Sequence, residues 1–277
     1  MEIRFISGKG GVGKSTVAAA MALAEAEKGR KTLLAELGHQ SFFESAFHLR
    51  VTNTPKPWKK GVDVVLWDGT SCLREYALHL LKSETLYKLF FENSVSKTLI
   101  NIAPGLAEVA ILGKITSGPP RNIGPKLDYE VIIVDAFASG HFLALLDAPV
   151  GFAKAIQIGP MGEQTRSIIS VLKDKAICEY HLVTLPEELP VQETIETRQK
   201  LIDRGWGDPK IWINRWLGEN SESGSPEFQR FLKTQLARQK TVAERFPDAS
   251  FLPWILENKF ENSVDRLVDY VDGKAIT

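Results

Sequence analysis

The stretch Gly8-Lys9-Gly10-Gly11-Val12-Gly13-Lys14-Ser15-Thr16 decides the fold of this 277-residue chain. The apolar residues 3–6 before it predict a first, buried parallel strand. Residues 17–28 after it combine Ala, Leu and Glu without a breaker and predict a helix. A glycine-rich turn that joins a strand to a helix and reads G-x-x-x-x-G-K-[ST] is the P-loop signature in its required context. The competing interpretation is a plain glycine-rich turn.

Each part of this turn has a physical task in holding phosphate. Glycines let successive backbone N–H groups point at phosphate oxygens, and the N-terminus of the following helix adds its positive end. Lys14 supplies a cation for the β and γ oxygens, and the Ser15 hydroxyl is a hard ligand for Mg²⁺. We therefore expect the chain to bind ATP or ADP with Mg²⁺ through the whole run, which consists of Gly8, Lys9, Gly10, Gly11, Val12, Gly13, Lys14, Ser15 and Thr16.

The composition excludes several classes of protein. The chain has 34 basic and 34 acidic side chains, so no overall field attracts nucleic acid or an anionic membrane, and no nucleic-acid partner is expected. The N-terminus lacks a signal-peptide pattern and no apolar run is long enough to span a bilayer, which predicts a cytoplasmic protein. Cys72 and Cys178 are isolated and no C-x-x-C occurs, so buried thiols are expected and zinc is not.

A second motif lies in the middle of the chain. Residues 129–135 read Y-E-V-I-I-V-D, an apolar strand that ends in Asp135. Ligands of open α/β sheets bind at the carboxyl ends of the strands, so this pattern predicts a Walker B carboxylate. Asp135 would then hold Mg²⁺ through a water or through Ser15. The alternative is an Asp that merely caps the next turn.

The remaining pattern alternates strands with helices. Further strands are predicted at residues 31–36, 62–67, 179–185, 211–214 and 250–252. Helices are predicted at 70–103, 106–115, from 153, from 163, at 187–204, after 226 and at 261–271. Loops are predicted at 37–47 and 117–125, with a break at 55–57 and a linker at 218–226. We expect one α/β P-loop NTPase domain over residues 1–277, with a mostly parallel sheet covered on both faces and a small helical insertion at about 70–117.

Several blocks resemble one family of ATPases. K-G-G-V-G-K-S-T, with Lys9 after the first glycine, is similar to the deviant P-loop of the MinD/ParA, nitrogenase iron protein and arsenite-pump ATPases. E-L-G-H from Glu36 resembles switch I, and D-A-F-A-S-G-H from Asp135 resembles switch II, of the arsenite-pump ATPases and the ATPases that guide tail-anchored membrane proteins. Residues 183–190 with Glu193-Thr194, the pair Asn214-Arg215 and the Leu-Pro pair ending at Pro253 also have counterparts there.

This resemblance implies roles for individual residues. Lys9 would touch the nucleotide of a partner in a homodimer, with a solvated loop lysine as the alternative. Glu36 would orient the attacking water, and Pro253 would belong to the loop that closes over the base. Asn214 would read adenine, since an amide offers one donor and one acceptor; otherwise it starts a turn. The implied catalytic residues are then Lys9, Lys14, Glu36 and Asp135, and the implied metal ligands are Ser15 and Asp135.

Departures from the family pattern keep more than one function open. Glu36 stands where the family has Asp, and Leu37, Phe137 and Ala138 also differ. The leading hypothesis is a dimeric Mg²⁺-dependent ATPase that couples ATP turnover to a conformational cycle on an unknown protein client or membrane partner. The first alternative is a nucleotide-switched binding protein with little hydrolysis. The second is a MinD/ParA-type positioning ATPase, which the acidic closing helix disfavours. Two isolated cysteines disfavour an arsenite site.

Overall fold

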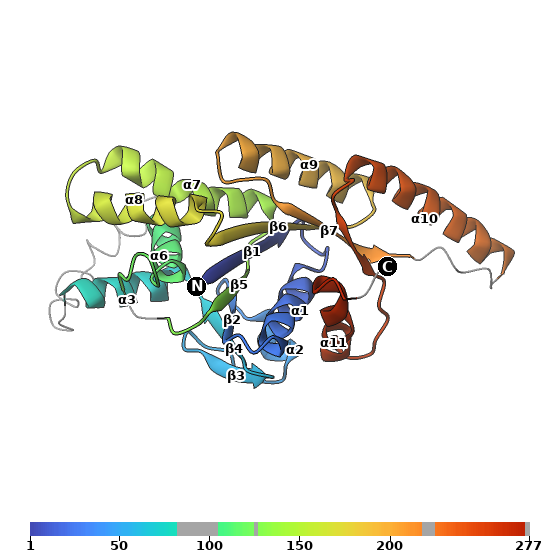
Figure 1. The fold of residues 1–277 in the computed structure, drawn as a ribbon, viewed down its shortest axis with the longest axis horizontal. Helices are drawn as coiled ribbons and strands as arrows, with labels where there is room; N and C mark the ends of the chain where they lie inside the picture. Colours follow the sequence, from blue (N-terminus) through green and yellow to red (C-terminus); the bar gives the residue numbers. More distant parts are fainter. Residues whose placement is uncertain (82–104, 125–126, 218–224, 275–277) are drawn as a thin grey trace.

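The computed structural model describes residues 1–81, 105–124, 127–217 and 225–274, and within them an eight-stranded sheet lies at the centre (Figure 1). The strands are β1 (Glu2–Gly8), β2 (Thr32–Leu37), β3 (Lys56–Lys59), β4 (Val62–Trp67), β5 (Val131–Asp135), β6 (Cys178–Thr184), β7 (Lys210–Trp216) and β8 (Ser250–Pro253). The described helices are α1 (Lys14–Glu27), α2 (Phe42–Ala46), α3 (Gly69–Leu81), α6 (Leu106–Ile115), α7 (Ser139–Ala155), α8 (Pro160–Lys173), α9 (Glu188–Asp203), α10 (Pro226–Arg245) and α11 (Phe260–Val271).

The order of the strands places the P-loop strand in the interior of the sheet. Across the sheet the order is β3-β4-β2-β5-β1-β6-β7-β8, and every described pairing is parallel except that of β3 with β4. In this register Asp135 of β5 lies beside Ile6 of β1 and also beside Glu36 of β2. The carboxyl ends of β1, β2 and β5 therefore lie next to one another at the same end of the strands. The predicted α/β fold with a mostly parallel sheet is confirmed.

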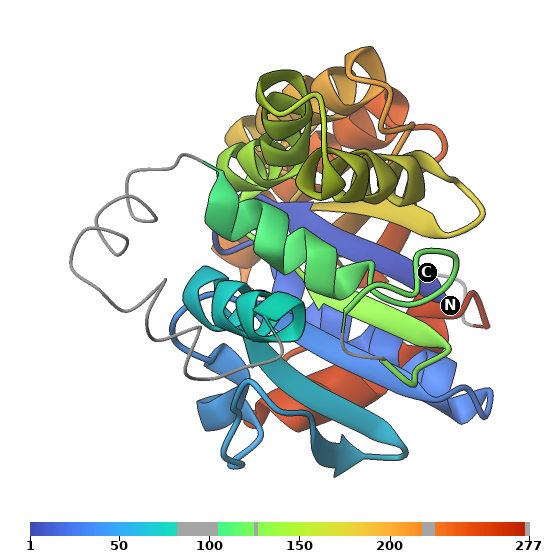
Figure 2. The same ribbon diagram turned by 90° about the vertical axis from the view of Figure 1, so that its left-hand side faces the viewer.

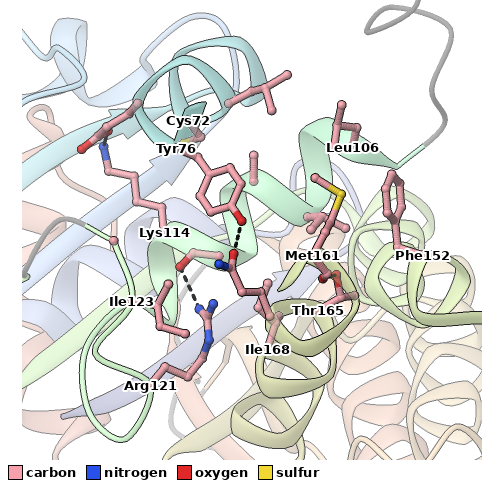
Figure 3. A pocket seen from close by; sticks show the side chains of 17 residues that line it. Cys72, Tyr76, Leu106, Lys114, Arg121, Ile123, Phe152, Met161, Thr165 and Ile168 are labelled. Atoms are coloured by element: carbon pink, nitrogen blue, oxygen red, sulfur yellow. Dashed lines mark hydrogen bonds and ion pairs between the residues drawn. The ribbon is translucent and has the colours of Figure 1, made fainter. Parts of the chain in front are cut away.

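Helices cover both faces of this sheet. Figure 1 shows α7, α8 and α9 on one face and α1 and α11 on the other, and Figure 2 shows the same layers from the side. The helices α3 and α6 pack on each other, and α6 also contacts α7 and α8. Between α3, α6 and α8 lies a pocket (Figure 3). The predicted span 70–103 begins with α3, while its residues 82–103, including the apolar stretch 86–91, lie outside the described residues.

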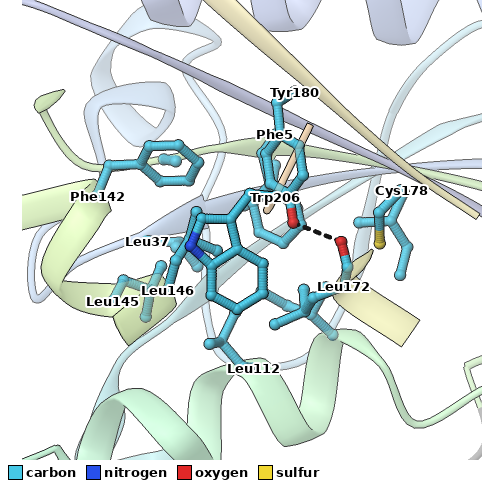
Figure 4. Close-up of a cluster of buried hydrophobic side chains, with 14 of the residues drawn as sticks. Phe5, Leu37, Leu112, Phe142, Leu145, Leu146, Leu172, Cys178, Tyr180 and Trp206 are labelled. Carbon is cyan, nitrogen blue, oxygen red and sulfur yellow. Dashed lines mark hydrogen bonds between the residues drawn. The ribbon is translucent and has the colours of Figure 1, made fainter. Parts of the chain in front are cut away.

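The core divides at the sheet because side chains of a strand alternate between its two faces. Phe5 points to the face covered by α7, where its ring stacks on Tyr180 at 5.6 Å and lies 6.0 Å from Phe142 (Figure 4). The Tyr180 hydroxyl donates to the Leu172 carbonyl at 2.7 Å, so this buried polar group is satisfied. Ile6 points to the opposite face and packs in the cluster that includes α1.

Two predictions between β2 and β4 are wrong. The predicted loop 37–47 contains the short helix α2, whose N-cap Ser41 accepts a hydrogen bond from the Glu44 N–H at 3.0 Å. The predicted break at 55–57 overlaps β3, which includes Lys56 and Pro57 and pairs antiparallel with β4 as an edge strand of the sheet. An edge strand tolerates Pro57 because its outward side needs no N–H donor.

The helix after the Walker B strand also begins earlier than predicted. The sequence predicts a helix from residue 153, but α7 runs from Ser139 to Ala155 and includes Pro149 in its interior. The apolar face of this helix, with Phe142 and Leu146 fully buried against the sheet, stabilises it despite the proline. The predicted linker 218–226 lies largely outside the described residues, and α10 begins at its end.

The C-terminal helix is a packed part of the domain core. Val264, Leu267 and Val268 of α11 are buried in the same apolar cluster as α1. This packing agrees with the docked helix that the sequence predicts. Among the described residues, no helix combines the length and apolar character that crossing a membrane requires.

Candidate functional site

The P-loop takes a shape that only glycine permits at two positions. Gly8 has φ 141°, and a Cβ atom there would lie 2.1 Å from the Val183 carbonyl oxygen of β6. Gly13 has φ 95°, and a Cβ atom there would lie 2.3 Å from the Asn214 side-chain nitrogen. Residues that carry a Cβ atom are strained at such φ values. The loop is therefore fixed by β6 on one side and by β7 on the other.

The tip of this loop is open, and its end begins a helix. Gly10 and Gly11 are exposed, and a Cβ atom on either would meet nothing within 4 Å. Val12 is buried, while Ser15 and Thr16 lie in the first turn of α1 after Lys14. A glycine tip above a helix N-terminus provides space and backbone donors for an anion. Nucleotide binding by residues 8–16 stays a prediction.

Asn214 lies against the P-loop. Its Nδ2 donates to the Val12 carbonyl at 2.8 Å, and its Oδ1 accepts from the Arg215 N–H at 2.9 Å. The side chain is buried, so both ends of its amide are used by backbone groups. Pro253 pairs with Trp216, two residues beyond Asn214. Contact of Asn214 and Pro253 with adenine remains a prediction.

The two P-loop lysines have different partners. The Lys14 ammonium donates to the Lys9 carbonyl at 3.1 Å; burial lowers the pKa of Lys14, and the nearby Asp135 and Glu193 carboxylates oppose that shift. The Lys9 Nζ lies 3.4 Å from Oε2 of Glu193 on α9. The other oxygen of Glu193 accepts from the Ser139 hydroxyl at the start of α7. Glu193 thus connects the P-loop to the segment after Asp135.

Asp135 ends β5 in a buried position. Burial raises the pKa of Asp135 to about 7; a hydrogen bond with Ser15 and the charge of Lys14 oppose the shift, and Glu36 adds to it. Its Oδ1 has no hydrogen-bond partner. A buried carboxylate oxygen without a partner is costly, because it has lost its water and gained nothing in return. The site is therefore short of positive charge beside Ser15.

Glu36 is held by the residues that follow it. Its carboxylate accepts from the Ser41 hydroxyl at 2.5 Å and from the Phe42 N–H at 2.6 Å. Burial raises the pKa of Glu36, and these two hydrogen bonds oppose the shift. The carboxylate stabilises the N-terminus of α2, where negative charge is favourable. For the catalytic role predicted for Glu36, the carboxylate would either act while it is bonded to Ser41 and Phe42 or move away from them.

A model of the anion-transporting ATPase family matches residues 1–161 and 156–259. The chain belongs to the anion-transporting ATPase family. The predicted resemblance to the arsenite-pump ATPases is thereby confirmed, and the protein is an ATPase of this family, whose members bind nucleotide.

Individual relatives of this ATPase are distant in sequence. ATPase BagA of Mycobacterium tuberculosis is 28% identical over 278 residues, covering 93% of this chain and 78% of the relative. The arsenical pump-driving ATPase of Acidiphilium multivorum is 26% identical over 232 residues, covering 78% of this chain and 39% of the relative. An ATPase ASNA1 homolog of Plasmodium chabaudi chabaudi is 29% identical over 153 residues, covering 55% of this chain and 37% of the relative.

In this family ATPase, sequence reasoning missed Glu193 as a site residue. Glu193 falls in a segment with a family counterpart, but only the fold brings it beside Lys9 and Ser139. His141, whose place in switch II matches the family, stacks on the Phe137 ring at 4.0 Å. No local pattern in the sequence signals either contact.

Proposed function

We propose that this ATPase hydrolyses ATP with Mg²⁺ as a homodimer, and that the cycle acts on a protein client or a membrane partner. The observation that carries the proposal is the buried Asp135 carboxylate, which has one oxygen without a hydrogen-bond partner. Ser15 hydrogen-bonds with this carboxylate, and the charge of Lys14 only partly offsets the cost of burying it. A site built this way favours a bound cation.

The residues present fit a magnesium ion. Ser15 supplies a hydroxyl oxygen, and Asp135 supplies the carboxylate oxygen that now lacks a partner. Oxygen ligands of this kind are those that Mg²⁺ prefers. When bound, Mg²⁺ would neutralise negative charge on the β and γ phosphates.

The chain's own groups supply the remaining chemistry. Lys14, next to the open glycine tip, would attract the phosphate oxygens and stabilise the charge that develops on them. Glu36 lies beside Asp135 in the sheet and would orient a water toward the γ-phosphate. For that task, the carboxylate has to exchange at least one of its bonds to Ser41 and Phe42 for the water.

Lys9 is the residue that would link two copies of the chain. It is half exposed and pairs with Glu193 across 3.4 Å, an interaction that solvent weakens. A nucleotide of a partner subunit would offer this lysine a stronger, more highly charged acceptor. Lys9 would then leave Glu193 and stabilise the transition state in the partner, as arginine fingers do in related enzymes.

The position of Glu36 favours a second candidate. Because both oxygens of this carboxylate are already bonded to the start of α2, hydrolysis could be slow, and the protein would then act chiefly as a nucleotide-switched binding protein. The two candidates differ in the turnover of the wild-type chain and in its response to Glu36→Gln.

The test measures ATP binding by calorimetry and steady-state turnover with Mg²⁺ for the wild type, Lys9→Ala, Glu36→Gln and the exposed control Lys240→Ala. Lys9→Ala should bind ATP normally but lose about 10³-fold in turnover, and wild-type dimers should appear in sedimentation with ATP. Lys240→Ala should behave as wild type. Wild-type turnover in Lys9→Ala would contradict the dimer mechanism, and equal, near-zero turnover in the wild type and Glu36→Gln would favour the switch.

A further inference from the structure

The pocket between α3, α6 and α8 is separate from the nucleotide site, since none of its lining residues belongs to the P-loop or to the switch segments. It is narrow and partly open, and together with the solvent at its mouth it encloses about 620 Å³. Figure 3 shows Leu106, Met161 and Phe152 on one side and Arg121 on the opposite side. Most of the lining is apolar, and the polar groups Glu75, Tyr76, Lys114, Arg121, Gln164 and Thr165 complete it, as in pockets for small molecules.

Arg121 is the polar group that distinguishes this pocket. Its Nε donates to the Ser167 hydroxyl at 2.8 Å, and its Nη1 donates to the Gly113 carbonyl and to Thr116. All of these acceptors are neutral, and within the part of the chain that the structure describes, no carboxylate pairs with Arg121 and its Nη2 donates no hydrogen bond. Burial lowers the pKa of Arg121 to about 10.

The neighbouring charges do not compensate Arg121. Lys114 and Glu75 neutralise each other in an ion pair at the pocket wall, and the Tyr76 hydroxyl donates to the Gln164 side chain and stays neutral. The carbonyls that Arg121 does bind lie at the C-terminal end of α6, where the helix dipole supplies about half a negative charge. The positive charge of Arg121 in the wall of a mostly apolar pocket is therefore only partly offset.

We propose that this pocket binds a slender organic monoanion, with its carboxylate on the Nη2 side of the Arg121 guanidinium and its apolar chain between Leu106, Phe152 and Ile168. The narrow shape selects an unbranched chain over a bulky ring system. The Nη2 edge of the guanidinium, which donates to no described residue, selects a carboxylate over an alcohol of the same length, because guanidinium–carboxylate bonds are charge-assisted. This site does not depend on the proposed dimer mechanism.

The test compares octanoate with octanol by calorimetry on the full chain saturated with ADP and Mg²⁺, which keeps the P-loop occupied. Octanoate should bind at one site per chain and at least about tenfold more tightly than octanol. In Arg121→Gln this preference should disappear, with octanoate binding no better than octanol. Equal binding of the two probes by the wild type, no binding of either, or a preference that survives Arg121→Gln would overturn the proposal.

A second variant locates the site without touching Arg121. In Gly113→Ala the new methyl group would lie 3.5 Å from the Ile168 side chain, an ordinary contact, so it narrows the pocket without a clash. Alanine also favours the helix over glycine, so the melting temperature without ligand should not fall. Octanoate should bind more weakly to this variant. An unchanged octanoate affinity in a folded Gly113→Ala would overturn the proposal even if Arg121→Gln fails to fold.

Discussion

Substituting Gly13 by alanine tests how the P-loop is held before any nucleotide binds. The residue lies at φ 95°, and its new Cβ would lie 2.3 Å from the Asn214 side-chain nitrogen. The Asn214 amide must then move, and its 2.8 Å bond to the Val12 carbonyl breaks. Gly11 has a similar φ of 82° with nothing near its Cβ, and Gly10 has neither constraint. Comparing alanine variants at these three glycines therefore distinguishes the cost of backbone strain from the cost of a steric clash.

The expected loss of stability follows from these two terms. An alanine in the left-handed region costs about 1–2 kcal/mol. A buried hydrogen bond that is broken so that a carbonyl is left unpaired costs about 1–3 kcal/mol more. Gly13→Ala should thus lower the free energy of unfolding by about 2–5 kcal/mol. Gly11→Ala should lower it by only about 1–2 kcal/mol, and Gly10→Ala should leave it nearly unchanged.

The assay is urea-induced unfolding without nucleotide, so that phosphate contacts play no part. A double mutant isolates the clash: once Asn214→Ala has removed the side chain, adding Gly13→Ala should cost only the strain of about 1–2 kcal/mol. The reasoning is refuted if Gly13→Ala costs no more than Gly11→Ala, or if its cost is the same with and without the Asn214 side chain.

Three further predictions concern stability and reactivity. Burial lowers the pKa of His181, so the unfolded chain binds a proton on this imidazole more readily than the folded protein does. The free energy of unfolding, measured with urea, should therefore fall as the pH drops below about 6.5. The fall should be smaller in His181→Gln. Burial raises the pKa of Cys72 and of Cys178 to about 12. At pH 8 both thiols should therefore react with a disulfide reagent about a thousandfold more slowly in the folded chain than in the unfolded chain. Equal reaction rates in the two states would contradict the burial of these thiols. Ser41→Ala removes the N-cap of α2 and a hydrogen bond to Glu36, so it should lower the free energy of unfolding by about 1–2 kcal/mol. The control Ser45→Ala, at an exposed position, should change the free energy of unfolding by less than about 0.5 kcal/mol.

The nucleotide site shows what local sequence can predict. The P-loop and the Walker B strand are contiguous motifs, so their residues, their flanking elements and their place at one edge of the sheet follow from short-range pattern. The glycine-rich turn, the buried β5 and the parallel sheet all agree with that pattern.

The contacts that shape the site are long-range and could not be predicted. Asn214 bonds to Val12 across 202 positions of the chain, and nothing near either residue signals the other. Glu193 meets Lys9 only because α9 folds over the carboxyl end of β1. The same holds for Arg121, which lies in the turn after α6 while its partner Ser167 lies on α8.

Predictions from local sequence were wrong where tertiary packing outweighed local preference. Glycine and polar residues at 37–47 favour a loop, yet an aromatic cluster stabilises α2 there: Phe43 stacks on Phe47 at 4.8 Å, and Phe47 stacks on Trp58 of β3 at 3.8 Å. Pro149 favours a helix boundary, yet α7 continues through it because its neighbours are buried against the sheet.

The two outermost strands limit how copies of this protein can associate. β3 contains Pro57 between Lys56 and Trp58, and β8 ends in Pro253, so each border of the sheet carries a residue that cannot donate a backbone hydrogen bond to an added strand. Lysines and prolines at such borders oppose edge-to-edge aggregation. Ribbon-like polymers built by extending the sheet are therefore disfavoured, and self-association is directed to the loops and helices of the molecule.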